Sequence, residues 1–521
     1  MSIDKEKLER NRMKKCLLSW IFTMALLFTG CSPDGNANDS DEVTPCEIHA
    51  DEDADNLCDT CGVSVLVYVD FYVVNDLHGK LADGEAHPGV DELSTYLKNA
   101  RIRDDYAIVL SAGDMWQGSA ESNMTKGALV TEWMNELDFA AMTIGNHEYD
   151  WGEEYIEANA KLAEFPFLAI NIYDRETNEL ADYCQPSVAV EVGELQIGII
   201  GAIGDCYSSI ASDKVEDVYF KVGNELTELV KAESERLREE GADCIVYVLH
   251  DGYGQSKSNP AIPSSQIKSY YDTELSNGYV DLVFEGHTHQ TYILQDEYGV
   301  YHMQHKGDNS GGISHVEVGI NSVNSNVKVN VARLVETGSY ESLTADSVVE
   351  DLMEKYKEQI APAYEVLGNN STYRSGDWMR QIVANLYYEV GMERWGDEYD
   401  IVLGGGFISV RNPYKLPAGD VTYSQLQSLF PFDNELVLCS IKGSDLMSKF
   451  FNSNNDNYFI QYGDYGVSVK NNFDHNATYY VVTDSYSSTY APNRMTEIER
   501  YDGGVYARDL LAEYIKNGGL E

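Results

Sequence analysis

Five short apolar runs in this 521-residue chain each end in side chains that bind metals. The runs end at Asp76-Leu-His78, Gly113-Asp114, Gly145-Asn146-His147, His250 and His287-Thr-His289. Short apolar runs bounded by turn residues predict buried strands. Because ligands of open α/β sheets gather outside the carboxyl ends of the strands, we expect these polar side chains to converge on one site.

The last run shows how two imidazoles can share a site. His287 and His289 are two residues apart, and residues with that spacing point the same way from extended backbone. Two histidines cannot complete the coordination of a metal, so the other runs must supply further ligands. Carboxylate, imidazole and amide oxygen form a set that suits zinc, manganese or iron. The candidate metal ligands are Asp76, His78, Asp114, Asn146, His250, His287 and His289.

Each motif taken alone has a structural alternative. A single histidine at a strand end is more often a hydrogen-bonded structural residue, and Gly-Asp alone usually marks a turn. Taken together, the five motifs favour a functional site. Of the remaining histidines, His302, His305 and His315 are interpreted as ordinary surface or pocket residues.

In order and composition the five motifs resemble the signature of the calcineurin-like metallophosphoesterases. The variants Asn75-Asp-Leu-His-Gly79 and Gly145-Asn-His-Glu-Tyr-Asp150 resemble the 5'-nucleotidase branch. The resemblance implies an α/β protein, with a four-layer α/β/β/α sandwich and a second, smaller α+β substrate-binding domain. It also implies two divalent ions, one held by Asp76, His78, Asp114 and His289 and the other by Asp114, Asn146, His250 and His287.

The ligand types indicate how such a site would act on a phosphoester. Two ions a few ångströms apart need one anionic bridge, for which Asp114 is the natural candidate. A water held between the ions has its pKa lowered to about 7 and becomes a hydroxide able to attack phosphorus. His147 would stabilise the phosphoryl charge or protonate the leaving alkoxide. Asp150 would orient and charge His147, which matches the His/Asp dyad of the family.

We expect the metallophosphoesterase domain over residues 64–335, a connecting helix over 336–370 and the substrate-binding domain over 371–521. The last of these resembles the 5'-nucleotidase C-terminal domain through Gly404-Gly-Gly406 and Phe430-Pro-Phe432. The resemblance implies that Phe432 and Tyr486 clamp a nucleobase beside Arg411. Leu403 stands where the family has Asn, and the Gly-Gly-Asp that follows the second aromatic is missing, so sugar recognition departs from the family pattern.

Residues 1–31 have the composition of a secretion signal. Lys14-Lys15 precede the apolar stretch Leu17 to Phe28, which ends in Thr29-Gly30-Cys31. This ending resembles a bacterial lipobox and implies lipid on Cys31, although Phe28 stands where the pattern prefers Leu. An uncleaved membrane anchor is the alternative. Both interpretations place the catalytic domain outside the cytoplasm and attach it to the cell membrane.

Residues 32–63 form an acidic linker with two spaced pairs of metal-binding side chains. The pairs are Cys46-x-x-His49 and Cys58-x-x-Cys61, whose spacing fits a tetrahedral zinc knuckle. A disulfide, which an oxidising exterior permits, and a flexible spacer are the competing interpretations. Asp51, Asp53 and Asp55 alternate like part of a calcium loop, but no bidentate Glu follows at the required distance.

Charge narrows the choice of substrate. The formal net charge of −49 makes nucleic-acid polymers poor partners, because binding to a phosphate backbone requires clustered Lys and Arg. A small phosphoester is still allowed, since two divalent cations make the site itself positive. We therefore favour hydrolysis of nucleotide phosphomonoesters outside the cytoplasm. The alternatives are cyclic nucleotides, nucleoside diphosphate sugars or a non-nucleotide phosphoester as substrate, and an inactive surface binding protein.

Overall fold

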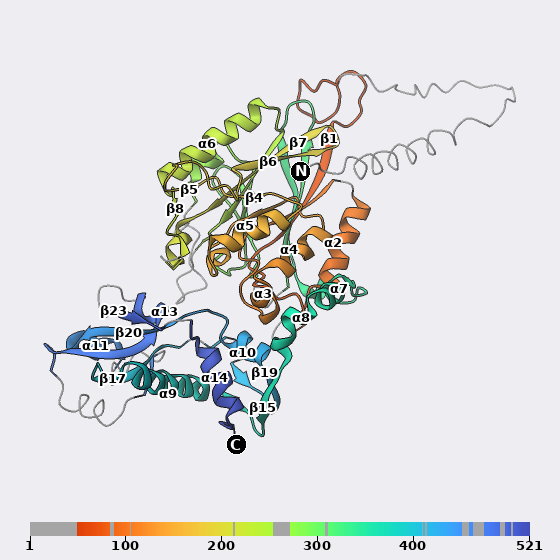
Figure 1. Ribbon diagram of the computed structural model, residues 1–521. Coiled ribbons are helices and arrows are strands. Elements are labelled where there is room, and N and C mark those ends of the chain that lie inside the picture. The colour runs from red at the N-terminus through yellow and green to blue at the C-terminus, as the bar shows by residue number, and fades with distance from the viewer. Residues whose placement is uncertain are drawn as a thin grey trace, which may run out of the picture.

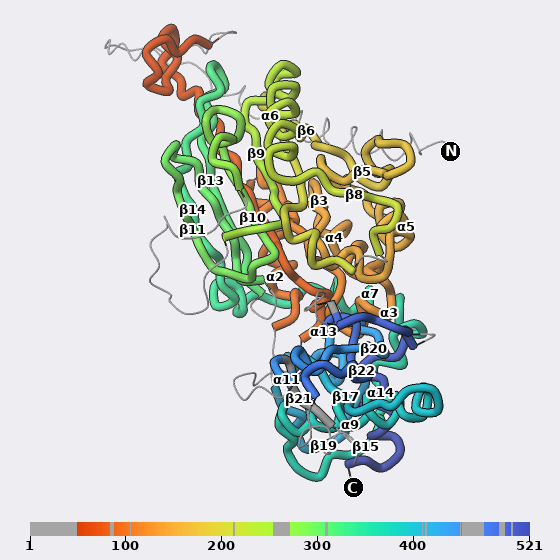
Figure 2. The backbone as a smooth tube through the Cα atoms, turned by 90° about the vertical axis from the view of Figure 1, so that its left-hand side faces the viewer, coloured from red at the N-terminus to blue at the C-terminus, as the bar shows by residue number. Residues whose placement is uncertain are grey.

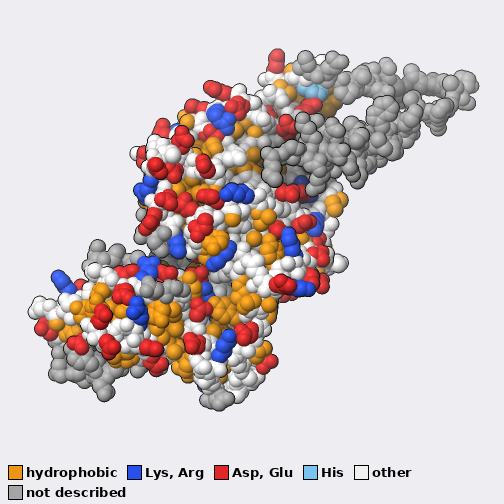
Figure 3. Space-filling view, in the orientation of Figure 1, with side chains coloured by type: hydrophobic (Ala, Val, Ile, Leu, Met, Phe, Trp, Pro, Cys, Tyr) orange, Lys and Arg blue, Asp and Glu red, His pale blue; other side chains and the backbone are white. Residues whose placement is uncertain are grey.

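The computed structural model describes two domains, which are stacked one above the other in Figures 1 and 2. The described residues are 49–83, 88–104, 106–211, 214–253, 271–307, 311–408, 410–411, 414–450, 458–461, 474–489, 495–501 and 504–520. The predicted signal segment with Cys31, and also Cys46, lie outside the described residues. Acidic side chains are spread over the visible surface of both domains (Figure 3).

The first domain contains two six-stranded sheets. The first sheet has the order β14 (Val327–Val335), β13 (Ile313–Asn321), β1 (Leu66–Val74), β2 (Ala107–Ser111), β3 (Ala141–Thr143) and β4 (Phe167–Leu168). The second has the order β11 (Tyr292–Gln295), β12 (Tyr301–Gln304), β10 (Leu282–Glu285), β9 (Cys244–His250), β7 (Leu195–Ile203) and β6 (Ser187–Val192). Strands β1 to β4 run parallel, as do β7, β9, β10 and β12, so their carboxyl ends share an edge within each sheet.

The two sheets pack face to face and carry helices on their outer faces. Apolar side chains of both sheets meet between them, for example Phe71 of β1 and Phe284 of β10, whose ring centroids are 6.3 Å apart. The outer helices are α2 (Asp91–Arg103), α4 (Ala128–Glu136) and α5 (Glu153–Leu162) on the first sheet and α6 (Asn224–Glu239) on the second. The predicted four-layer α/β/β/α sandwich is therefore confirmed.

Sequence periodicity explains why the outer layers are helical. In α6 the buried apolar residues Leu226, Val230 and Leu237 recur at helical spacing and cover β7 and β9, while Arg236 and Glu240 pair on the exposed side. Strands that are covered on both faces are apolar over nearly their whole length, as in β9, where every residue is buried and the last is His250. The shorter elements are α3 (Ala120–Thr125), β5 (Ile172–Asp174), β8 (Val218–Phe220), η1 (His147–Tyr149), η2 (Asp205–Ser209) and η5 (Thr273–Ser276).

The connection between the domains differs from the predicted single helix over 336–370. It consists of η7 (Thr337–Ser339), α7 (Val348–Lys355), α8 (Lys357–Ile360) and η8 (Ala361–Tyr364), followed by the strand β15 (Val366–Asn370). Residues 340–347 between η7 and α7 are not helical. A further break falls at Tyr356, between α7 and α8, where the Tyr356 hydroxyl donates to Glu132 of α4 at 2.8 Å. Another falls at Pro362, which lacks the N–H that an α-helix needs to continue. The expectation of one continuous helix was therefore wrong.

The second domain is an α+β unit, as predicted. Its five-stranded sheet has the order β21 (Tyr458–Gln461), β17 (Ile401–Phe407), β22 (Thr478–Asp484), β20 (Leu436–Lys442) and β23 (Met495–Arg500). Two short pairs join β15 to β19 (Gly419–Thr422) and β16 (Arg374–Ser375) to β18 (Lys415–Leu416). The helices are α9 (Gly376–Trp395), α10 (Tyr423–Leu429), α11 (Gly443–Phe450), α13 (Ser485–Thr489) and α14 (Ala507–Lys516). A capping box formed by Thr422 and Gln425 begins α10.

Candidate active site

All seven predicted ligand residues lie at the carboxyl ends of strands and meet in one place. Asp76 and His78 follow β1, Asp114 follows β2, Asn146 follows β3, His250 ends β9, and His287 and His289 follow β10. Both sheets therefore contribute. The convergence arises because these ends lie at one edge of the two packed sheets.

The backbone at five of these residues is held in an unusual conformation. Asp76, His78, Asp114, His287 and His289 have positive φ angles between 50° and 67°, a region that residues other than glycine seldom adopt. Each such residue costs on the order of 1–3 kcal/mol, which the surrounding structure must offset. Strain concentrated at one set of polar side chains indicates a functional site.

One group of donor atoms surrounds Asp76. His289 Nε2 lies 3.5 Å from Asp76 Oδ1 and 3.3 Å from His78 Nε2. The backbone N–H of His287 donates to both carboxylate oxygens of Asp76, at 2.9 and 3.0 Å, and the Asn75 amide donates to Oδ2 at 2.6 Å. One donor atom from each of Asp76, His78 and His289 lies within 4.8 Å of the others, which suits one cation.

A second group joins Asp114 to the other sheet. His250 Nε2 lies 3.2 Å from Asp114 Oδ1 and 3.2 Å from Asn146 Oδ1, and His287 Nδ1 lies 2.9 Å from the same amide oxygen. Asp76, Asp114 and His250 again place donor atoms within 4.8 Å of one another, so Asp76 belongs to both groups. Asp114 Oδ2 is buried and has no hydrogen-bond partner among the described residues. A buried carboxylate oxygen without a donor fits a bound cation.

Hydrogen bonds behind the site orient two of the imidazoles. His78 Nδ1 donates to the carbonyl of Gln117 at 2.8 Å, and His250 Nδ1 donates to the carbonyl of Ala112 at 2.6 Å. Each ring is thereby turned so that Nε2 faces the other donors, as in metal-ligating histidines. Burial and the neighbouring histidines lower the pKa of His78 well below its usual value, so that ring is neutral and able to bind a metal.

The two carboxylates make the cluster attractive to positive charge. Burial acts to lower the pKa of His250, but Asp114 and Asp76 outweigh it and raise that pKa to about 10. Without metal ions, His250 is therefore protonated at neutral pH. Divalent cations would satisfy the same carboxylates, so the charge and the donor set together fit a metal centre.

Glu148 is a structural residue of the site that sequence reasoning missed. Its buried carboxylate accepts hydrogen bonds from the backbone N–H groups of Asp114, Met115 and Gly145, at 2.9, 2.8 and 2.7 Å. Glu148 therefore ties the loop after β2 to the loop after β3. Its position directly after Asn146-His147 was the one sequence feature that could have drawn attention to it. No local pattern, however, shows that its carboxylate accepts a hydrogen bond from a backbone N–H 34 residues away.

Replacing Glu148 by alanine is expected to lower the free energy of unfolding by about 3 kcal/mol or more, because three buried N–H groups would lose their acceptor. The midpoint of guanidinium unfolding, followed by tryptophan fluorescence, measures this loss. The exposed Glu239→Ala is the control and should shift the free energy by less than about 0.5 kcal/mol. Equal midpoints for the two variants would show that Glu148 does not hold the loops.

His147 and Asp150 form the predicted pair. His147 Nδ1 lies 2.9 Å from Asp150 Oδ2, and the backbone N–H of His147 donates to Asp114 Oδ1 at 2.9 Å. Burial acts to lower the pKa of His147, but the carboxylates of Asp150 and Asp114 raise it to about 9. The ring is therefore positively charged at neutral pH. It lies edge-on to His78, with the centroids 5.2 Å apart.

The second domain reaches this pair through Phe432. The ring of Phe432 stacks on His147 with a centroid distance of 5.7 Å, and the guanidinium of Arg411 lies 4.8 Å from the centre of the same ring. The side-chain amide of Gln117 donates to the carbonyl of Pro431 and joins the two domains beside the site. Two predicted substrate residues, Phe432 and Arg411, are thus placed next to the ligand cluster.

The other features of the predicted pocket have different surroundings. The ring of Tyr486 lies beside Phe407, with centroids 6.0 Å apart, and is 45% exposed. Leu403 is fully buried in the core of the second domain, where it packs with strand residues and cannot replace a sugar-binding Asn. His302, His305 and His315 are all buried, so of the two interpretations, surface or pocket, the first is wrong. Their neighbours include Asp296, Glu336 and Asp70, respectively.

Cys206 is a second residue of the site that no sequence pattern indicated. Its thiol donates to the carbonyl of His250 at 2.9 Å, and its sulfur lies within 4.8 Å of ring nitrogens of His250 and His287. Burial and nearby Asp251 raise the pKa of this thiol well above its usual value, so it is neutral. Through its hydrogen bond to the backbone carbonyl, Cys206 therefore helps to hold His250 in position.

Two family models match the chain. Residues 69–291 match the calcineurin-like phosphoesterases, and residues 366–494 match the C-terminal domain of the 5'-nucleotidases. The chain belongs to the calcineurin-like phosphoesterases of the 5'-nucleotidase family. The first match contains all seven candidate ligands together with His147 and Asp150, and the second contains Arg411, Phe432 and Tyr486.

Individual members of this family are distant in sequence. Protein UshA of Yersinia enterocolitica is 26% identical over 384 residues, which cover 65% of this chain and 66% of that protein. The venom 5'-nucleotidase of Crotalus adamanteus is 23% identical over 413 residues, covering 72% and 66%. The chain thus spans about 66% of the length of these relatives. The crystal structure of the 5'-nucleotidase precursor of Thermus thermophilus has the same fold, with a TM-score of 0.64 at 19% identity over 87% of this chain and 96% of that one.

Proposed function

We propose that this chain is an extracytoplasmic dimetal phosphoesterase that hydrolyses nucleotide phosphomonoesters. The supporting observation is that side chains from five strand ends, both sheets and both domains meet at one buried cluster beside the His147–Asp150 pair. One cation would be held by Asp76, His78, Asp114 and His289, and the other by Asp114, Asn146, His250 and His287. The bridging role of Asp114 is supported by its unpartnered Oδ2 atom.

Bound divalent cations would supply a nucleophilic hydroxide at neutral pH and would neutralise the phosphoryl oxygens. The chain's own residues complete the chemistry. His147, which is charged because of Asp150 and Asp114, is placed to stabilise the phosphoryl oxygens or to give its Nε2 proton to the leaving alkoxide. The Asp150 carboxylate binds Nδ1 of His147, so the other ring nitrogen, Nε2, points away from Asp150.

Phe432 and Arg411 support a nucleotide as the substrate. A phosphate bound at the cluster would have its leaving group beside Phe432, because that ring contacts His147. Nucleobases stack on aromatic rings and on guanidinium planes, and both surfaces are present here within 4.8 Å of each other. Leu403 lies in the core, however, so the sugar would have to be recognised by other groups than in the family pattern.

A panel of phosphoesters tests this function. The purified chain with manganese or zinc is expected to release phosphate from nucleoside monophosphates, and a chelator should abolish the release. Cyclic nucleotides, nucleoside diphosphate sugars and sugar phosphates complete the panel. Faster hydrolysis of one of these would assign the same chemistry to another phosphoester, an outcome that the core position of Leu403 favours. Release from none of these compounds would support an inactive binding protein instead.

The proposed location depends on the N-terminal sequence. The basic pair, the apolar stretch and Thr29-Gly30-Cys31 support export and lipid attachment. In the part of the chain that the structure describes, no helix has both the length and the apolar character needed to cross a membrane. Cells supplied with a radiolabelled fatty acid are expected to label the wild-type chain and Cys439→Ala, which alters a buried thiol of the second domain, but not Cys31→Ala. Equal labelling of Cys31→Ala, or no label on the wild-type chain, would exclude lipid on Cys31.

A further inference from the structure

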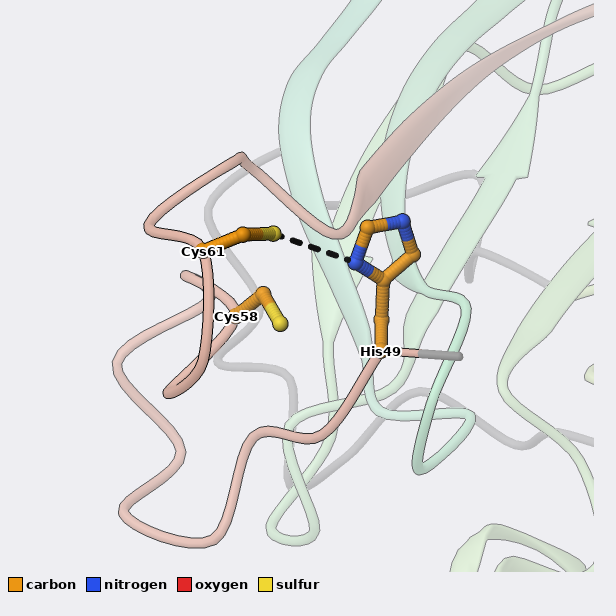
Figure 4. A group of neighbouring side chains, drawn as sticks. All are labelled: His49, Cys58 and Cys61. Atoms are coloured by element: carbon orange, nitrogen blue, oxygen red, sulfur yellow. Dashed lines mark hydrogen bonds between the residues drawn. The ribbon is translucent and has the colours of Figure 1, made fainter. Parts of the chain in front are cut away.

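Three metal-ligating side chains lie together outside the active site. Figure 4 shows His49, Cys58 and Cys61 directed toward one another, and the Cys61 sulfur is 3.6 Å from His49 Nδ1. One donor atom from each residue lies within 4.8 Å of the others. Donors around one tetrahedral zinc ion, with bonds of about 2.0–2.3 Å, are roughly 3.5 Å apart. The observed spacing therefore matches a zinc site.

The backbone around these residues is built to hold them. The N–H of Gly62 donates to the carbonyl of Cys58 at 2.7 Å, and the N–H of Cys58 donates to the carbonyl of Val63 at 2.8 Å. Gly62 has a φ of +69°, which closes a tight turn and keeps the two cysteines on the same side. The N–H of Asp59 donates to the carbonyl of Ala50 at 2.8 Å and so ties this turn to the residue after His49.

The donor types of this cluster indicate which ion would fit it. The thiolate is the form that binds metals. Nitrogen and sulfur donors select zinc over calcium and magnesium, which require oxygen ligands.

The segment has too small an apolar core to be held by packing alone. Its buried cluster contains only Cys58, Cys61 and Val65 among the described residues. The neighbouring carboxylate of Asp51 already accepts two hydrogen bonds, from the backbone N–H of Asn56 at 3.2 Å and from the Asn321 side-chain amide at 2.5 Å. Small modules without an adequate core are commonly stabilised by a disulfide or a structural metal.

We propose that His49, Cys58 and Cys61 hold a structural zinc ion that stabilises the fold of residues 49–65, a segment attached to the end of the β13–β14 hairpin. The hairpin side of this attachment is formed by Asn321, which donates to Asp51, and by Ser322, whose N–H donates to the carbonyl of Val65 at 2.9 Å. Cys46 lies outside the described residues, and the proposal does not depend on it.

The location of this site distinguishes it from the catalytic centre. Figures 1 and 2 both place the segment at the end of the first domain that is remote from the second domain. The active site, in contrast, faces the second domain through Phe432. The zinc would therefore fix the point at which the chain enters the phosphoesterase domain without contributing to the chemistry.

Cobalt(II) reports on the site because only thiolate ligands give intense near-ultraviolet charge-transfer absorption with this ion. The full chain, stripped of metal and titrated with cobalt(II), is expected to show this absorption. Asp114→Asn, which alters the catalytic centre, and Cys184→Ser, which removes a distant buried thiol, should keep it. The double variant Cys58→Ser/Cys61→Ser should lose it.

Two further measurements separate this proposal from its alternatives. The double variant is expected to keep its phosphoesterase activity, which shows that it folds, but to be cleaved by a protease between residues 49 and 65, where the zinc-loaded chain resists. A Cys58–Cys61 disulfide found by mass spectrometry, in a chain that takes up no cobalt after reduction, would overturn the zinc site. Unchanged absorption in the double variant would do the same.

Discussion

Asp114→Asn is expected to lower kcat/KM for phosphoester hydrolysis by about 10³-fold or more. The carboxylate of Asp114 lies 3.2 Å from His250 in the second donor group, and its Oδ2 has no hydrogen-bond partner among the described residues. An amide would remove the negative charge that both cations need and would place a donor where a cation is expected. Charge stabilisation by the cations contributes several kcal/mol, and each 1.4 kcal/mol corresponds to a factor of ten in rate.

The matched control is Asp281→Asn. Asp281 directly precedes β10 at the end opposite to His287 and forms an ion pair with Arg238. It should keep nearly full activity while losing some stability. Metal content, determined by mass spectrometry of the purified proteins, should fall in Asp114→Asn and not in Asp281→Asn. Unchanged metal content and rate in Asp114→Asn would contradict the dimetal assignment.

His147→Ala is expected to lower kcat by about 10²–10⁴-fold, which is the usual range for loss of a general acid or a positioned charge. The imidazole is held by Asp150 and carries a positive charge at neutral pH, because the nearby carboxylates raise its pKa to about 9. The metal ligands are unaltered, so metal content should not change. Rates measured on a nucleotide and on an ester with a better leaving group test the proton-transfer role. The better leaving group needs less protonation, so the rate of its hydrolysis should fall less in His147→Ala.

The contact between His147 and Phe432 provides the control for this variant. Loss of the stacked ring alone would alter substrate binding and therefore raise KM. Phe432→Ala is expected to show that pattern, with a raised KM and a smaller change in kcat. If His147→Ala changed KM as Phe432→Ala does and left kcat intact, His147 would act by positioning the second domain and not in the chemistry.

The candidate ligands could be selected from the sequence because each depends on a local pattern. An apolar run followed by a turn predicts a buried strand and its end, and polar side chains at several such ends must meet at one edge. His147 and Asp150 could be paired because they are three residues apart.

The sequence by itself therefore predicted the candidate ligands and the His147–Asp150 pair, and its resemblance to a known family predicted the layers. Only the tertiary structure decided which groups support them. Glu148 accepts from backbone groups of a different strand end, and Phe432 contacts His147 from a separate domain. These contacts depend on how distant segments pack, and no local periodicity records them. For the same reason the breaks at Tyr356 and Pro362, and the burial of Leu403, became evident only in the folded chain.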